Sequence, residues 1–150
     1  MSNSVKENIL ANVESVLKGI SLIQNVYRGK SRSINLEESE LPAAVLYEQS
    51  DSVDERETGL LLSRRMRVVV EFWSGALTSP AYDLDSSLVY LEGLITQAVM
   101  EDNAQGGYAR YTEIGDTQRI LLEDDDTLGG GMLAFDIVYQ VNEENPFSGG

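Results

Sequence analysis

The 150-residue sequence predicts a single α+β domain, a two-layer sandwich in which two helices cover one face of a mostly antiparallel four-stranded sheet. Two segments carry apolar residues at the spacing of an amphipathic helix. Others alternate apolar and polar residues, as half-buried strands do, and glycine-containing turns separate them. The order helix, strand, strand, helix, strand, strand favours antiparallel neighbours with both helices on one side.

The helices are expected over residues 3–20 and 82–101. Each has one apolar stripe: Val5, Ile9, Val13, Val16, Leu17 and Ile20 in the first, and Leu84, Leu88, Leu91, Leu94, Ile95, Ala98 and Val99 in the second. Ser4 is placed to cap the first helix, and Asp83 and Asp85 lie near the positive end of the second. Gly93 costs about 1 kcal/mol relative to alanine inside a helix, and close packing on the sheet would explain it.

The strands are expected over residues 41–47, 60–73, 108–114 with 119–123, and 132–141; the third is either two segments or one long strand bent at Gly115 and Asp116. The alternation is clearest in 60–73, where Met66 and its even-numbered neighbours face one way and Arg65, Arg67, Glu71 and Trp73 face the other. Arg64 falls on the apolar side, where we expect its head group to reach water near the strand end.

Polar segments separate these elements. Residues 27–40 carry little apolar pattern and residues 48–58 are acidic, so both are expected to be loops. Residues 124–131 are predicted to be a hairpin connection in which Gly129, Gly130 and Gly131 relieve the backbone of a turn. Residues 142–150 are expected to form a flexible polar tail.

Composition excludes several classes of function. The chain has no cysteine and no histidine, which removes disulfides, thiolate metal sites and histidine-dependent nucleophiles. Its formal net charge of −14 should repel nucleic-acid backbones and anionic membranes. We expect neither a signal peptide nor a transmembrane segment. The simpler interpretation of the charge is solubility, and a dedicated acidic binding surface is the alternative.

No constellation of residues predicts an enzyme, a metal site or a cofactor site. The carboxylates of residues 123–126 lack the spacing of a calcium loop, so a solvated turn is the simpler interpretation. Two carboxylate pairs, Asp83 with Asp85 and Glu71 with Asp136, are candidates for acid–base chemistry, but any acidic chain offers such pairs by chance. A hydrolase using carboxylates and a metal therefore ranks last.

The residues that most suggest a subunit or partner interface are Arg64, Arg65, Arg67, Glu71, Trp73, Tyr111 and Asp136. The three arginines form a dense basic patch, which could bind a phosphate or an acidic partner. Two further interpretations are equally favoured: cross-strand pairing of the arginines with Glu113 or Asp136, and neutralisation of an acidic face on a neighbouring subunit. Trp73 and Tyr111 fit either a protein interface or a cap over the edge of the core.

Four features follow one another along the chain. They are Leu-Pro-Ala-Ala-Val at 41–45, the alternating Arg-Met-Arg-Val-Val-Val-Glu-Phe-Trp at 65–73, a helix from Leu84 that ends in Ala-Val-Met-Glu-Asp at 98–102, and a closing strand with Leu-Ala-Phe-Asp-Ile-Val-Tyr at 133–139. This layout resembles the tail terminator family of long-tailed bacteriophages, the group that includes minor tail protein U and related tail-completion proteins. The resemblance covers about residues 5–141 and is one of element order, without a signature motif.

The resemblance implies one tail-terminator-like domain in a non-catalytic protein of the virion tail, assembled in the cytoplasm of a bacterial host. Such proteins form a hexameric ring on the finished tail tube, stop its polymerisation and present a surface for joining the head. The implied partners are further copies of the chain, the tail-tube protein and a head-completion or connector protein. The alternatives are a neck or head–tail connector ring protein and a monomeric acidic module, such as an inhibitor or immunity protein.

Overall fold

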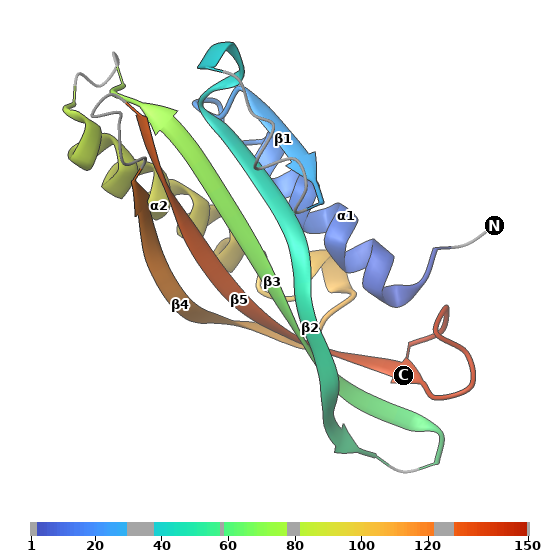
Figure 1. Ribbon diagram of the computed structural model, residues 1–150. Coiled ribbons are helices and arrows are strands. Elements are labelled where there is room, and N and C mark those ends of the chain that lie inside the picture. Colours follow the sequence, from blue (N-terminus) through green and yellow to red (C-terminus); the bar gives the residue numbers. More distant parts are fainter. Residues whose placement is uncertain (1–2, 30–37, 58, 78–81, 122–127, 150) are drawn as a thin grey trace.

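A computed structural model describes residues 3–29, 38–57, 59–77, 82–121 and 128–149 of the chain (Figure 1). Its elements, in chain order, are helix α1 (Val5–Lys18), strand β1 (Asn25–Arg28), the 3₁₀ turn η2 (Glu38–Glu40), strands β2 (Ala43–Arg56) and β3 (Leu61–Gly75), helix α2 (Leu84–Glu101), the 3₁₀ turn η3 (Gln105–Gly107), and strands β4 (Tyr111–Leu121) and β5 (Leu128–Asn142).

The strands form one sheet in the order β1-β2-β3-β5-β4, and both helices lie on the same side of it (Figure 1). All neighbouring strands are antiparallel except β1 and β2, which are parallel. The predicted α+β two-layer class is therefore confirmed. The predicted strand number was one too low, since the sheet has five strands.

The helices pack their apolar stripes on alternate residues of the central strands. The buried core joins residues from five elements: Ile9, Val13 and Leu17 of α1; Leu88, Leu91, Ile95 and Val99 of α2; Ala44 and Leu46 of β2; Met66, Val68, Val70 and Phe72 of β3; Leu133, Phe135 and Ile137 of β5. Every second residue of the strands thus packs against the apolar stripe of a helix, so each element buries one of its faces. The opposite sheet face has no helix over it.

Each helix starts two residues later than predicted, at Val5 and Leu84, and the predicted cap at Ser4 is confirmed. The hydroxyl of Ser4 accepts a hydrogen bond from the backbone N–H of Glu7 at 3.1 Å, and the carboxylate of Asp83 accepts one from that of Ser86 at 2.8 Å. Each cap satisfies a helix N–H that has no partner within its own helix. The interpretation of Gly93 was wrong, because it lies on the exposed side of α2 and no heavy atom lies within 4 Å of where its Cβ would be.

Strand β1 corrects the start of the loop predicted over residues 27–40, because Tyr27 and Arg28 belong to it; residues 30–37 lie outside the described part of the chain. Two backbone hydrogen bonds beside its ends join it to the next strand, from Gln24 to the carbonyl of Pro42 at 2.8 Å and from Gly29 to that of Leu46 at 2.9 Å. The side chain of Arg28 reaches across to α1, where its Nη1 lies 2.6 Å from Glu7. A four-residue edge strand is too short to show a period, which is why the sequence pattern missed it.

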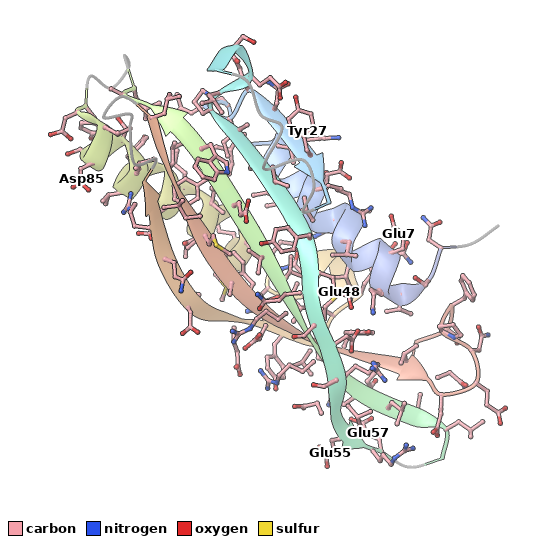
Figure 2. All side chains as sticks on the ribbon, in the orientation of Figure 1. Glu7, Tyr27, Glu48, Glu55, Glu57 and Asp85 are labelled. Carbon is pink, nitrogen blue, oxygen red and sulfur yellow. The ribbon has the colours of Figure 1, made fainter. Side chains whose placement is uncertain are left out.

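Strand β2 corrects the loop predicted over residues 48–58, since it continues to Arg56. Its outer half is polar on both faces because the β2–β3 hairpin extends beyond both helices, and Figure 2 shows Glu55 and Glu57 near its far end. Two β-bulges, between Glu48 and Ser50 and between Val53 and Glu55, further disturb the alternation.

Strand β4 is one strand with a register shift between Ile114 and Thr117, which confirms the predicted bend. Gly129, Gly130 and Gly131 correct the predicted turn, because they lie inside β5, paired with β3. Residues 142–149 turn back on the fold: the N–H of Asn142 donates to the carbonyl of Ser148 at 2.9 Å. The carbonyl of Pro146 accepts from the N–H at the start of α1 at 3.0 Å.

Gly130 supplies the first testable prediction. A Cβ on this residue would lie 2.5 Å from the backbone oxygen of Phe72 and 2.7 Å from the ring of Trp73. Gly130→Ala should therefore lower the free energy of unfolding by about 1–3 kcal/mol, measured by urea denaturation. Gly93→Ala is the matched control, because its Cβ enters open space. Equal stability of the two variants would contradict the tight approach of β5 to β3.

Candidate functional site

The sheet face without helices carries six of the seven predicted interface residues. On β3, Arg65, Arg67, Glu71 and Trp73 alternate with the core residues and so point away from the helices. Their neighbours on the same face are Asp136, opposite Arg67 on β5, and Tyr111, opposite Val138 on β4. This uncovered face is the candidate site, and Arg64 lies on the opposite, helix-facing side of β3.

One end of the uncovered face is a network of ion pairs that spans four strands, β2, β3, β5 and β4. Arg67 makes two hydrogen bonds to Asp136, at 3.0 and 3.2 Å. Arg65 donates to Glu113 at 3.1 Å and to Asp54 at 3.2 Å. These hydrogen bonds raise the pKa of both guanidinium groups. The predicted cross-strand pairing is therefore confirmed, and the positive charge of both arginines is matched within the chain.

The other end of the uncovered face is apolar and aromatic. Ala43, Val45 and Val69 lie there, each at most 2% exposed although no helix covers them. Tyr47 donates a hydrogen bond at 2.9 Å to one carboxylate oxygen of Glu71, a residue that is only 6% exposed. Burial, and then this hydrogen bond, raise the pKa of Tyr47 to about 12.

Two buried polar atoms at this end have no hydrogen-bond partner. They are the second carboxylate oxygen of Glu71 and the indole nitrogen of Trp73, which lie two residues apart on β3 and on the same face. Buried polar groups in folded proteins are nearly always paired, because an unpaired one loses its bonds to water without replacement. One acceptor and one donor are therefore left unsatisfied on the face that carries no helix.

Arg64 belongs to a separate cluster on the helix-facing side. Its Nε lies 2.7 Å from Asp51, whose side chain is 6% exposed, and Lys6 of α1 lies 2.9 Å from the same carboxylate. The hydroxyl of Tyr139 donates to it at 2.5 Å. Sequence reasoning missed Asp51 because it assigned this residue to a loop. The signal was Arg64 itself, since a cation on an apolar strand face requires a partner.

The candidate carboxylate pairs do not form acid–base pairs. Asp136 is opposite Arg67, four residues along β3 from Glu71, or roughly 13 Å at the usual strand rise. Asp83 caps α2, and its hydrogen bonds from Ser86 lower the pKa of its carboxyl group. Within the described residues, no group of three or more acidic side chains is arranged to hold a metal ion. Residues 123–126 lie outside the described part of the chain.

The fold and the site define a class: a small α+β sandwich with one sheet face that neither of its two helices covers. No protein-family model matches the chain, and no curated protein does. Among solved structures 38 chains match, and one is a chain from a "Virion of native gene transfer agent (GTA) particle". The two share 10% identity with a TM-score of 0.38, over 91% of this chain and 92% of that chain. At this score the similarity carries no functional argument.

No helix in the described part of the chain is both long and apolar enough to cross a bilayer.

The tyrosine on the helix-facing cluster gives a pH prediction. Burial first, and then the hydrogen bond to Asp51, raise the pKa of Tyr139 in the folded state. The unfolded chain releases this proton near its ordinary pKa of about 10, so stability is complete below that pH and is lost as pH rises above it. Tyr139→Phe should remove part of this alkaline loss.

The measurement is the urea midpoint at neutral pH and at pH values above 10. At neutral pH, Tyr139→Phe should cost about 1 kcal/mol, because it removes one hydrogen bond. Tyr108→Phe is the control, since Tyr108 is 48% exposed. An alkaline loss that is the same in both variants and in the unmodified chain would contradict the prediction.

Proposed function

We propose that the chain is a structural protein of a phage or prophage virion, a tail terminator that forms a ring on the end of the tail tube. In this role it stops tube polymerisation and offers the surface to which the head joins. Its partners are further copies of itself, most simply as a hexamer, the tail-tube protein and a head-completion protein. It acts without catalysis and without a cofactor.

The observation that carries the proposal is the pair of unsatisfied atoms on the uncovered face. The carboxylate oxygen of Glu71 and the indole N–H of Trp73 are buried without partners. A shift on assembly of the side chains that bury these two atoms would let a neighbouring subunit supply a donor to the first and an acceptor to the second. This supports assembly, and the resemblance in element order connects assembly with the tail terminator role.

Two further features agree with a ring. A ring needs a heterologous contact, in which two different patches of one chain meet. Among the described residues, β4 pairs with β5 alone, so its other edge is open, and Tyr111 and Ile114 on it are 37% and 54% exposed. The chain therefore offers an open strand edge and an uncovered sheet face as two distinct surfaces.

The first test is absolute mass by light scattering over a concentration series, with and without magnesium. We expect a discrete species near six times the 16.5 kDa of one chain, favoured by concentration and by cations that screen the acidic charge. Binding of this species to isolated tail-tube ends would support a terminator. Binding to portal or adaptor rings instead would indicate a connector.

A strict monomer that also ignores tail-tube ends would contradict the proposal. If that monomer bound a basic protein tightly, with steep salt dependence, the result would favour the alternative that the chain is a monomeric acidic interaction module.

The second test addresses the uncovered face directly. Glu71→Gln keeps an oxygen for Tyr47 and replaces the unpaired oxygen by an amide donor. If a neighbouring subunit donates to that oxygen, assembly should require about ten-fold higher concentration, because a hydrogen bond to a charged group is lost. Sedimentation velocity measures the assembly, and thermal unfolding of the monomer shows that the fold is unaffected.

Glu113→Gln is the matched control, since Glu113 lies on the same face and is paired with Arg65. Assembly weakened equally by both variants would assign the effect to general charge, and assembly unchanged by Glu71→Gln would remove this face from the ring contact.

A further inference from the structure

The outward side of α2 has an unusual composition for a helix exposed to water. Opposite its buried stripe it presents an outer stripe of six exposed residues: Tyr82, Ser86, Val89, Tyr90, Gly93 and Gln97. None of them is charged, although 24% of the chain is. The solvent side of a surface helix is ordinarily its charged side. Val89 is 51% exposed, and the rings of Tyr82 and Tyr90 pack edge to face with centroids 5.6 Å apart.

Beside the outer stripe lies a groove of about 480 Å³ between α2 and the end of α1. Its apolar lining comes from Ile20, Leu22, Tyr90, Leu94 and Ala98. Tyr90 therefore belongs to both the outer stripe and the wall of the groove. The two adjoin on the helical layer, on the side of the molecule away from the uncovered sheet face, and the polar side chains of Ser86 and Gln97 lie among their apolar residues.

Gly93 in the middle of this stripe is the second, independent observation. A glycine inside a helix lowers its stability relative to alanine. Nothing within the chain requires this one, because a Cβ would meet no heavy atom within 4 Å. A residue without a side chain at the crest of an exposed helix lets another backbone approach closely, as no other residue can.

The charges around the stripe decide what kind of surface fits it. Residues 68–109 contain no lysine or arginine. Asp85, at the start of α2 (Figure 2), and Glu92 and Glu101 flank the stripe and the groove. A second copy of α2 placed on the same stripe would bring acidic residues face to face, which is repulsive. A partner with lysine or arginine on its rim would be attracted.

We propose that the outer stripe of α2 and its groove form a docking surface for a different protein, which presents an apolar ridge one helix wide, rimmed by basic side chains. Gly93 is the point of closest approach, and Tyr82, Val89 and Tyr90 provide the apolar contact. The inference does not depend on the proposed function, because it concerns the opposite layer of the molecule and is tested on the full chain alone.

The test uses Gly93→Ala, which changes no charge. As the probe we choose a fluorescent 18-residue helical peptide with a leucine and alanine stripe between rows of lysine, titrated by anisotropy. Gly93→Ala should weaken binding about ten-fold. The same variant should raise Tm by about 2–4 °C, since alanine favours the helix. Loss of binding with a gain of stability separates a docking role from a structural one.

Ser15→Ala on α1 is the matched control, since Ser15 is also an exposed helical residue. It should leave peptide binding unchanged. A peptide with the same residues in shuffled order reports attraction by net charge alone.

Five results would overturn the proposal. Two concern the peptide: no saturable binding, or binding no tighter than that of the shuffled peptide. Two concern Gly93→Ala: binding equal to that of the unmodified chain, or a lowered Tm, which would assign Gly93 an internal role. A dimer of the unmodified chain that Gly93→Ala dissociates would make a second copy the occupant.

Discussion

The packing of two helices on one face of β3 and β5 is the interaction on which the rest of this structure depends. The even-numbered residues of β3 from Met66 to Phe72 are fully used in that contact. Since successive strand residues point to opposite faces, every odd-numbered residue is then committed to the other side. The two sheet faces therefore have different environments. One is buried by the chain itself, and the other must be made compatible with water or with another molecule.

One end of the uncovered face is compatible with water, and the other end is compatible with contact by another molecule. At the Arg67 end, opposite charges on neighbouring strands satisfy one another, and such partly exposed pairs contribute modestly to stability. At the Trp73 end, Ala43, Val45 and Val69 are buried although no helix lies over them, and two polar atoms lack partners. The first end has the properties of a surface exposed to water. At the second end, the unpaired atoms lower the stability of the chain, and hydrogen bonds to another molecule would remove that loss.

The sequence predicted the elements whose side chains repeat with a clear period, and missed those whose position depends on register. Both helices, β3, β5 and the bend of β4 follow from period and caps. Strand β1 is too short for a period. The outer half of β2 is polar on both faces, because it lies beyond the helices, and its acidic residues pair with arginines of β3, as Asp51 does with Arg64. Of the site, the arginine pairs with Glu113 and Asp136 followed from alternation. Burial of Glu71, and the open space at Gly93, depend on three-dimensional packing.

The distribution of charge links the two layers. The described arginines of the β2–β3 hairpin each contact a carboxylate: Arg56, Arg64, Arg65 and Arg67 all make ion pairs within the chain. Residues 68–109 hold six acidic residues and no basic one, so part of the net charge of −14 is concentrated in the segment that contains α2. In the sheet layer the charges of these arginines are therefore balanced, and a partner would be recognised there by shape and by hydrogen bonds. The acidic helical layer would attract a basic partner over a longer distance. A protein with these two unlike surfaces on opposite sides can hold a neighbour of one kind and recruit a basic partner of another.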